Sequence, residues 1–235
     1  NGIERRDGSI HKAHLASPGL SRHLAREGRI DLADDELRDN VVTFIGAGHE
    51  TTALTLTFSL YLIANTPEVQ DRLLREVLEV CGDKPIDAAM IDAMPYHEQV
   101  IKEAMRLYPP VAIIDRIATT DIDLGDAQIK KGDLAFALIY IMHRHKKLWD
   151  NPELFDPDRF SEARARAIPR FQYMPFGAGP RICIGMKFAY MEAVAILATL
   201  VRALRFLPNP AHTVEPNIRI TLRPERGMPL FVEPR

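Results

Sequence analysis

The longest helix that the pattern of apolar and polar positions predicts runs from Asp34 to Asn65. Its acidic start suits the positive end of a helix dipole, and no proline interrupts the segment. Thr66-Pro67 ends this helix and opens a second one, which we expect to reach about Val80 and to stop at Gly82.

Short β-type runs and irregular chain separate two later helices. Pro95 to Leu107 fits a third helix, and apolar periodicity resumes from Gly185 to about Leu204. Residues 145–182 are proline-rich with little periodicity, and long irregular segments inside compact domains are usually functional. The fold class predicted is mainly α with a minor β part. Short strands are expected at 111–114, 117–124, 129 and 134–137 and, between prolines, over 206–232.

Composition and charge narrow the classes of function. The chain has 235 residues, 46% of them hydrophobic, and 30 Lys and Arg against 32 Asp and Glu give a net charge of −2. This balance lacks the basic excess of a nucleic-acid-binding protein. No apolar stretch approaches the ~20 residues of a membrane span. Cys81 and Cys183 form no disulfide framework, so we expect a reducing, cytoplasmic location. Residues 1–30 are expected to be a polar, poorly defined lead-in to a domain portion over 31–235.

The centre of the longest predicted helix carries unusual residues. Gly46 and Gly48 each cost about 1 kcal/mol relative to alanine, and Glu50 and Thr51 are polar where burial would otherwise fit. Small residues let a flat ligand approach a helix closely, and the Thr51 hydroxyl can bond the carbonyl of Ala47 and bend the helix. A small-molecule site fits this segment. A helix–helix crossing at the glycines, with the polar pair solvated, fits it equally well.

Charged residues mark two further segments. Glu103 and Arg106 are neighbours on one helix face and can pair, although exposed pairs of this kind are common. In Phe155-Asp156-Pro157-Asp158-Arg159-Phe160, packed aromatics could bury Arg159 against an acid such as Glu103. A surface ion pair and a solvated arginine are the ordinary alternatives, and they are favoured while each segment is taken alone.

The strongest chemical signal is the segment Phe176-Gly177-Ala178-Gly179-Pro180-Arg181-Ile182-Cys183-Ile184-Gly185. Glycines and a proline constrain this loop, and the helix predicted after it favours a thiolate at Cys183. Phe176 can shield the sulfur, and Arg181 supplies a nearby cation. A rigidly held thiolate with no second cysteine or histidine beside it suits a single axial metal ligand. A buried structural cysteine and a nucleophilic cysteine are the alternatives, but the loop holds no histidine base.

In this order and spacing, the four segments resemble the cytochrome P-450 superfamily of haem-thiolate monooxygenases. The resemblance runs from about Asp31 to the C-terminus and rests above all on FGAGPRICIG, which looks like the family's cysteine loop at every defining position. AGHETTA is similar to the oxygen-groove motif of the family's long central helix, and Glu103 with Arg106 matches its Glu-x-x-Arg. The resemblance implies that this chain is the C-terminal, haem-binding half of that fold.

The resemblance also implies a role for each matching residue. Cys183 would be the proximal thiolate ligand of the haem iron, with Arg181 and Arg116 on the propionates. Glu50 and Thr51 would form the acid–alcohol pair that delivers protons to dioxygen.

The remaining roles follow from the same resemblance. Glu103, Arg106 and Arg159 would form a buried triad, and Asp158 stands where glutamate is more usual in the family. The haem would also contact Ala47, Gly48, Phe176 and Gly177, and the candidate substrate contacts are Phe44, Ile45, Val111 and Ile114.

The implied reaction inserts one atom of dioxygen into a C–H or C=C bond of an apolar substrate, and the other atom leaves as water. Haem b (iron protoporphyrin IX) would be the cofactor, because a thiolate on its iron favours O–O cleavage. Electrons from NAD(P)H would arrive through a separate ferredoxin- or flavoprotein-type donor, since the chain carries no flavin or iron–sulfur signature.

Members of the family are longer than this chain, so we expect a C-terminal fragment whose missing N-terminal half is a partner and a possible site of a membrane anchor. Two alternatives stay open. One is a peroxide-driven or isomerising haem-thiolate enzyme, which would not need Glu50 and Thr51. The other is a haem-free or inactive fragment that acts as a structural module.

Overall fold

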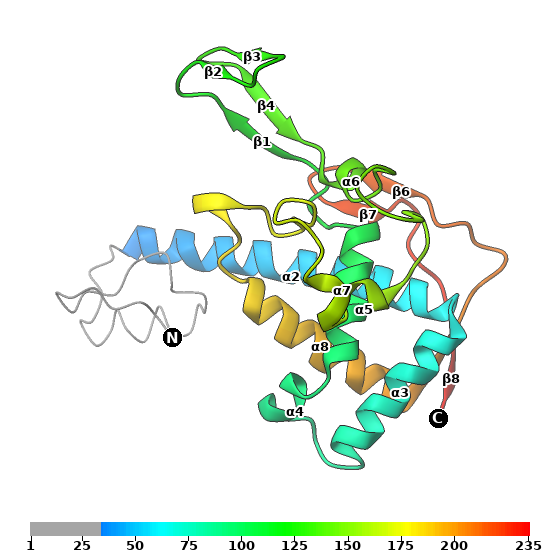
Figure 1. Ribbon diagram of the computed structural model, residues 1–235. Coiled ribbons are helices and arrows are strands. Elements are labelled where there is room, and N and C mark those ends of the chain that lie inside the picture. The colour runs from blue at the N-terminus through cyan, green and yellow to red at the C-terminus, as the bar shows by residue number, and fades with distance from the viewer. Residues whose placement is uncertain (1–33) are drawn as a thin grey trace.

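The structure is mainly helical, as expected, with small sheets. The computed structural model describes residues 34–235, so the lead-in expected over residues 1–30 lies outside the described residues. Figure 1 shows the longest helix running across the middle of the molecule, with the other main helices around it. These helices are α2 (Asp34–Ala64), α3 (Pro67–Cys81), α5 (Pro95–Leu107) and α8 (Met186–Ala203), and the short α4 (Ala88–Asp92) joins α3 to α5.

Local chemistry explains where the helices start and stop. Pro67 and Pro95 lie in the first helical turn, where the missing amide hydrogen costs nothing and the fixed φ suits a helix. Gly82 follows α3 with a φ of +53°, a left-handed angle that favours glycine. The predicted bounds of all four main helices are confirmed to within one or two residues.

The core lies where the four main helices meet. A neighbouring cluster buries Cys81 at the end of α3 with Met94 and Val194, so this cysteine has a structural role. The main cluster includes Leu56 and Ile63 of α2, Leu73 of α3, Val100 of α5 and Leu197 of α8.

The strands within residues 34–235 form small antiparallel sheets of two strands each. The sheets formed by β1 with β4 and by β2 with β3 make an arm that projects from the helical body in Figure 1. The pairs are β1 (Ile114–Ile117) with β4 (Leu134–Ala137), β2 (Ile122–Asp123) with β3 (Gln128–Ile129), β5 (Leu204–Leu207) with β8 (Phe231–Pro234), and β6 (Pro216–Ile218) with β7 (Leu222–Pro224).

Two of the expected strands are wrong in their extent. Of residues 111–114 only Ile114 pairs in a ladder, because Ala112 is buried in a cluster with Phe58 and its carbonyl accepts a hydrogen bond from the amide of Tyr140 at 3.1 Å. The stretch 117–124 is not continuous, since β1 ends at its first residue and β2 covers only two residues near its end.

The segment expected to be irregular holds only short helical turns within residues 145–182. These are η2 (Pro157–Phe160), α7 (Glu162–Ala165) and η3 (Gly179–Arg181), and α6 (Ile139–Met142) comes just before the segment. Among residues 34–235, no helix combines the length and the apolar character that crossing a membrane requires.

Candidate functional site

Cys183 lies on an exposed loop between η3 and α8. Its amide donates a hydrogen bond to the carbonyl of Phe176 at 3.0 Å, which closes the loop, and its thiol forms no disulfide. Gly177 and Gly179 both have a φ of +73°, in the left-handed region that other residues rarely adopt. The loop geometry therefore requires the glycines that the sequence places there.

The rest of the molecule holds this loop from two sides. The Phe176 ring packs against the Tyr190 ring of α8 with centroids 5.2 Å apart, and it also contacts the main core. On the other side, a Cβ at Gly177 would lie 3.4 Å from Cδ1 of Ile114, so the loop passes close to β1. Ile114, a candidate substrate contact, is therefore a neighbour of the cysteine loop.

Two exposed arginines accompany the thiol. Arg116 lies on β1 two residues after Ile114, so it shares that strand face. Within residues 34–235 its side chain donates only to the adjacent carbonyl of Asp115, from Nη1 at 2.7 Å. Arg181 lies in η3 and forms no hydrogen bond with residues 34–235. Both guanidinium groups are available for carboxylates of a ligand, which they can bind in bidentate fashion.

The centre of α2 presents an open surface. Apart from the adjacent residues and the backbone of α2 itself, no described residue comes within 4 Å of the positions that Cβ atoms would take at Gly46 or Gly48. Among residues 34–235, no helix therefore crosses α2 at its glycines, and that alternative is wrong for this part of the chain. The Thr51 hydroxyl donates to the carbonyl of Ala47 at 2.7 Å, as expected from the sequence.

Glu50 has partners that the sequence did not suggest. Its carboxylate accepts hydrogen bonds from Thr221 and Arg223, two residues at the C-terminal hairpin formed by β6 and β7. These residues are far from Glu50 in sequence, and nothing in their local pattern links them to α2. Only the packing of the hairpin shows this contact.

A second cluster is formed by Glu103 and Arg106 of α5, which are both 0% exposed. The guanidinium of Arg106 binds the carboxylate in bidentate fashion, with Nε donating to Oε2 at 2.7 Å and Nη2 donating to Oε1 at 2.8 Å. Arg159 of η2 donates to the same Oε1 from its Nε at 3.2 Å. The three residues thus meet in the interior, and the surface alternatives for them are wrong.

The electrostatics of this cluster are those of a buried but fully paired carboxylate. Burial raises the pKa of Glu103, and the hydrogen bonds and positive charge of Arg106 oppose that rise. Asp156 adds a backbone amide donor to Oε1 at 3.0 Å. Asp158 stays outside the cluster and instead binds Nη1 of Arg72 on α3 at 2.8 and 2.9 Å. No local pattern in the sequence predicted this contact between α3 and η2.

Comparison with known proteins fits these observations. The sequence profile described as "Cytochrome P450" matches residues 5–231. The chain belongs to the cytochrome P450 family. The match begins ahead of residue 31, so the resemblance to the family extends further towards the N-terminus than the motifs alone suggested.

Several P450 relatives share more than a third of their aligned residues with this chain. "Probable cytochrome P450 4s3" of Drosophila melanogaster is 39% identical over 242 residues, which cover 99% of this chain and 48% of that protein. "Cytokinin hydroxylase" of Arabidopsis thaliana is 38% identical, covering 92% of this chain and 42% of that protein. "Cytochrome P450 4F8" of Homo sapiens is 37% identical, with 87% and 40% covered. The chain thus spans less than half the length of these relatives.

The residues around Cys183 fit the haem that P450 membership implies. Haem is a flat apolar ring with two carboxylates at one edge and an iron that takes axial ligands. The site offers one exposed thiol, two arginines free to bind carboxylates and an uncovered helix face at Gly46 and Gly48. Exposed apolar side chains on the same elements include Ile45 on α2, Ile117 on β1, Ile182 and Ile184 on the loop and Phe188 on α8.

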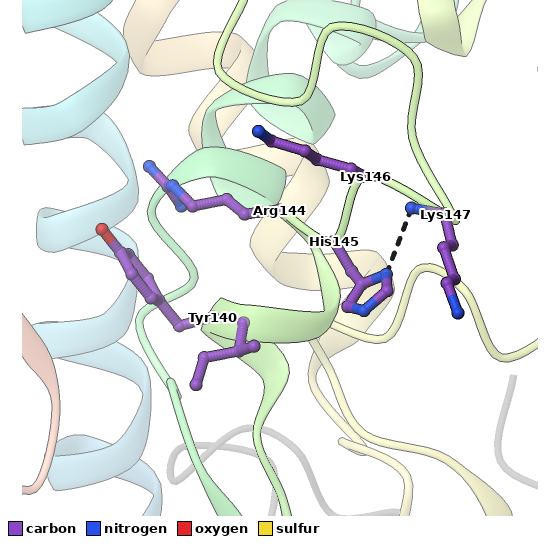
Figure 2. A pocket seen from close by; sticks show the side chains of 6 residues that line it. Tyr140, Arg144, His145, Lys146 and Lys147 are labelled. Carbon is purple, nitrogen blue, oxygen red and sulfur yellow. Dashed lines mark hydrogen bonds between the residues drawn. The ribbon is translucent and has the colours of Figure 1, made fainter.

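The candidate substrate contacts differ in exposure. Phe44 and Ile114 are half-buried, Val111 is half-buried ahead of β1, and Ile45 is 58% exposed. A separate hollow, with a volume of about 470 Å³, lies at α6 and the loop after it. Figure 2 shows the side chains that line it. No predicted site residue lines this hollow, whose lining is Tyr140, Ile141, Arg144, His145, Lys146 and Lys147.

His143 connects the buried cluster of this P450 chain to its cysteine loop. Its carbonyl accepts a hydrogen bond from Nη1 of Arg106 at 2.8 Å, and its ring Nε2 accepts one from the amide of Met174 at 2.9 Å. The ring is 0% exposed and stacks on Tyr173 with centroids 5.3 Å apart. Burial is the main cause that lowers the pKa of His143 to about 4, so the imidazole is neutral in the folded protein.

Replacing Glu103 with glutamine is expected to lower the free energy of unfolding by about 3–5 kcal/mol, because it leaves two buried guanidinium groups without a carboxylate. Glutamine has nearly the same shape, so the loss reports charge and not a cavity. Urea denaturation measures it. The control is Glu162→Gln, which weakens an exposed pair with Arg166 and should cost less than about 1 kcal/mol. Equal losses in the two variants would contradict the central role of the cluster.

The low pKa of His143 predicts an acid-sensitive fold. Between about pH 6.5 and pH 4 the unfolded chain binds a proton at this site that the folded chain does not, so the free energy of unfolding falls as pH falls. Between pH 6.5 and 5 this site contributes a loss of about 1.5 kcal/mol. His143→Gln keeps an acceptor for Met174 but does not titrate, so urea curves at several pH values should show a weaker dependence. His145→Gln, at an exposed position, is the control, and an unchanged slope in His143→Gln would refute the assignment.

Proposed function

We propose that this chain is the C-terminal, haem-binding half of a P450 monooxygenase, with residues 31–235 as its haem-thiolate portion. The observation that carries the proposal is the thiol of Cys183, exposed on a glycine-constrained loop directly before α8. Membership of the family and a length of 40–48% of the relatives support the same conclusion.

The chain's own residues would hold haem b from several sides. Cys183 would bind the iron, and backbone amides at the start of α8 would tune the sulfur. Arg116 and Arg181 would bind the two propionates. When haem is bound through a thiolate, its iron activates dioxygen, so that one atom enters a C–H or C=C bond and the other leaves as water. The ring would further contact Ala47, Gly48, Phe176 and Gly177.

Glu50 and Thr51 would supply protons for this reaction. The Thr51 hydroxyl already donates to Ala47, so its oxygen lone pairs can accept a hydrogen bond from a neighbouring donor while the helix holds the group in place. Glu50 is half-exposed and can exchange protons with water. Together they provide a route from solvent to the open surface of α2, which is the task of a proton relay.

The substrate we propose is an apolar small molecule, because the candidate contacts Phe44, Ile45, Val111 and Ile114 are apolar. The relative from Arabidopsis thaliana is named a hydroxylase, which agrees with oxygen insertion. Electrons would come from NAD(P)H through a ferredoxin- or flavoprotein-type donor. We propose a reducing compartment such as the cytoplasm, since the thiol of Cys183 must stay reduced to bind iron.

Two other functions compete with this proposal. The presence of both Glu50 and Thr51 weighs against a peroxide-driven or isomerising enzyme, which needs no proton relay. A haem-free structural module is favoured only by the short length of the chain relative to its relatives. The spectrum of the reduced, CO-treated protein separates this module from the haem-thiolate proposal.

The reduced, CO-treated protein with haem supplied is expected to show a strongly red-shifted Soret band, because that band requires a thiolate on the iron. Cys183→Ser should abolish the band, whereas Cys81→Ser, at the buried cysteine, should keep it. A band that persists in Cys183→Ser would refute the ligand assignment. A band in a longer parent protein but not in this chain would favour the structural module for the chain alone.

Thr51→Ala is expected to keep haem and the CO band but to divert electrons from product to peroxide, because the proton relay loses its hydroxyl. The ratio of product to NAD(P)H consumed measures this effect, and it should fall at least about tenfold. Thr57→Ala is a matched control, since Thr57 makes the same type of bond to the carbonyl of Ala53 at 2.7 Å. An unchanged ratio in Thr51→Ala would exclude the relay role.

A further inference from the structure

The hairpin of β6 and β7 is anchored firmly beside α2. Leu222 is 1% exposed and packs in one cluster with Phe58 of α2. Its amide donates to the carbonyl of Pro110 at 2.8 Å, which ties the hairpin to the chain just after α5. Residues at the tip of this hairpin are therefore held in a fixed position relative to α2.

Thr221 and Arg223 of this hairpin contact one oxygen of Glu50. The Thr221 hydroxyl donates to Oε1 of Glu50 at 2.8 Å, and Nη2 of Arg223 donates to the same oxygen. Nη2 of Arg223 also donates to the Thr221 hydroxyl at 3.2 Å, so the three groups form a closed set. Among residues 34–235, no group donates to the other oxygen, Oε2.

Within the described residues, the guanidinium of Arg223 donates hydrogen bonds only to Glu50 and Thr221. Arg219, a second arginine on the hairpin, pairs instead with Glu225 at 3.3 Å. The Nε of Arg223 is buried and has no hydrogen-bond partner within residues 34–235, so the guanidinium is not held by other acceptors of the hairpin. Thr221 is 6% exposed, which limits competition from water for its hydroxyl.

We propose that Thr221 and Arg223 are positioning residues for Glu50, an inference that rests on the proposed function. By binding Oε1 they fix the carboxylate beside Thr51 and leave Oε2 as the oxygen that exchanges protons. The acid of the relay is then positioned by the C-terminal hairpin and not by α2 alone. Glu50 does the proton chemistry, and the hairpin acts through it.

The test compares Arg223→Ala and Thr221→Val with Glu50→Gln in the haem-loaded protein, using an ethoxycoumarin as apolar probe and a ferredoxin with its reductase as donor. Arg223→Ala should lower the ratio of product to NAD(P)H by about tenfold, close to the value for Glu50→Gln. It should leave the CO band and the KM for the probe unchanged, and it should increase the solvent isotope effect on kcat. Arg223→Lys, which keeps the charge, should recover part of the ratio.

Two further comparisons separate positioning from general stability. The double variant of Glu50→Gln with Arg223→Ala should have the same ratio of product to NAD(P)H as Glu50→Gln alone, because both changes remove the same function. In the haem-free chain, the decrease in Tm for the double variant should be smaller than the sum of the decreases for Glu50→Gln and Arg223→Ala. Arg219→Ala removes an equal charge from the same hairpin without touching Glu50, and it should change neither the ratio nor the isotope effect.

The outcomes distinguish this inference from the proposed function. An unchanged ratio in Arg223→Ala, with a lowered ratio in Glu50→Gln, would overturn the inference and leave the haem-thiolate function intact. Additive Tm shifts would overturn it as well. If Arg223→Ala does not fold, Arg223→Lys and Thr221→Val carry the test, since each weakens only one donor. The haem-thiolate part of the proposed function is tested separately, by the CO measurement with Cys183→Ser.

Discussion

The buried ion pair between Glu103 and Arg106 is the interaction on which the arrangement of the site depends. Charges with no exposure to water are stable only when each donor and acceptor is paired. Arg106 therefore also donates to the carbonyls of His143, Pro152 and Leu154, at 2.8, 2.7 and 3.0 Å. One side chain on α5 thus fixes three points of a segment with little regular structure of its own.

The same contacts extend to the cysteine loop. The His143 ring accepts a hydrogen bond from the amide of Met174. The carbonyl of Met174 in turn accepts a hydrogen bond from the amide of Gly177 at 3.1 Å. The loop is further held by Phe176 against the core and by its approach to β1. The position of Cys183 is consequently set by the helical core, although its thiol is exposed. A ligand bound by this thiol would meet a rigid loop, which is what a fixed axial ligand requires.

The open centre of α2 does not depend on this buried ion pair. Its glycines leave a surface that no described residue covers, and its one acidic side chain is held by a hairpin from the other end of the chain. The cysteine loop and the proposed proton relay are thus positioned by separate long-range contacts. A substitution at the Glu50 contact can therefore leave the cysteine loop in place, and the reverse also holds.

The sequence by itself determined the four main helices, the irregular segment and the loop around Cys183, because these depend on local properties: proline at helix starts, apolar periodicity and glycines at positive φ. It also placed the residues of the family motifs in order. The motifs also implied the buried triad of Glu103, Arg106 and Arg159. Only the tertiary structure decided that Asp158 binds Arg72, that Ala112 alone among residues 111–114 is buried, and that Arg223 binds Glu50. These outcomes depend on which surfaces exclude water and on contacts between residues far apart in the chain, and no local pattern encodes either.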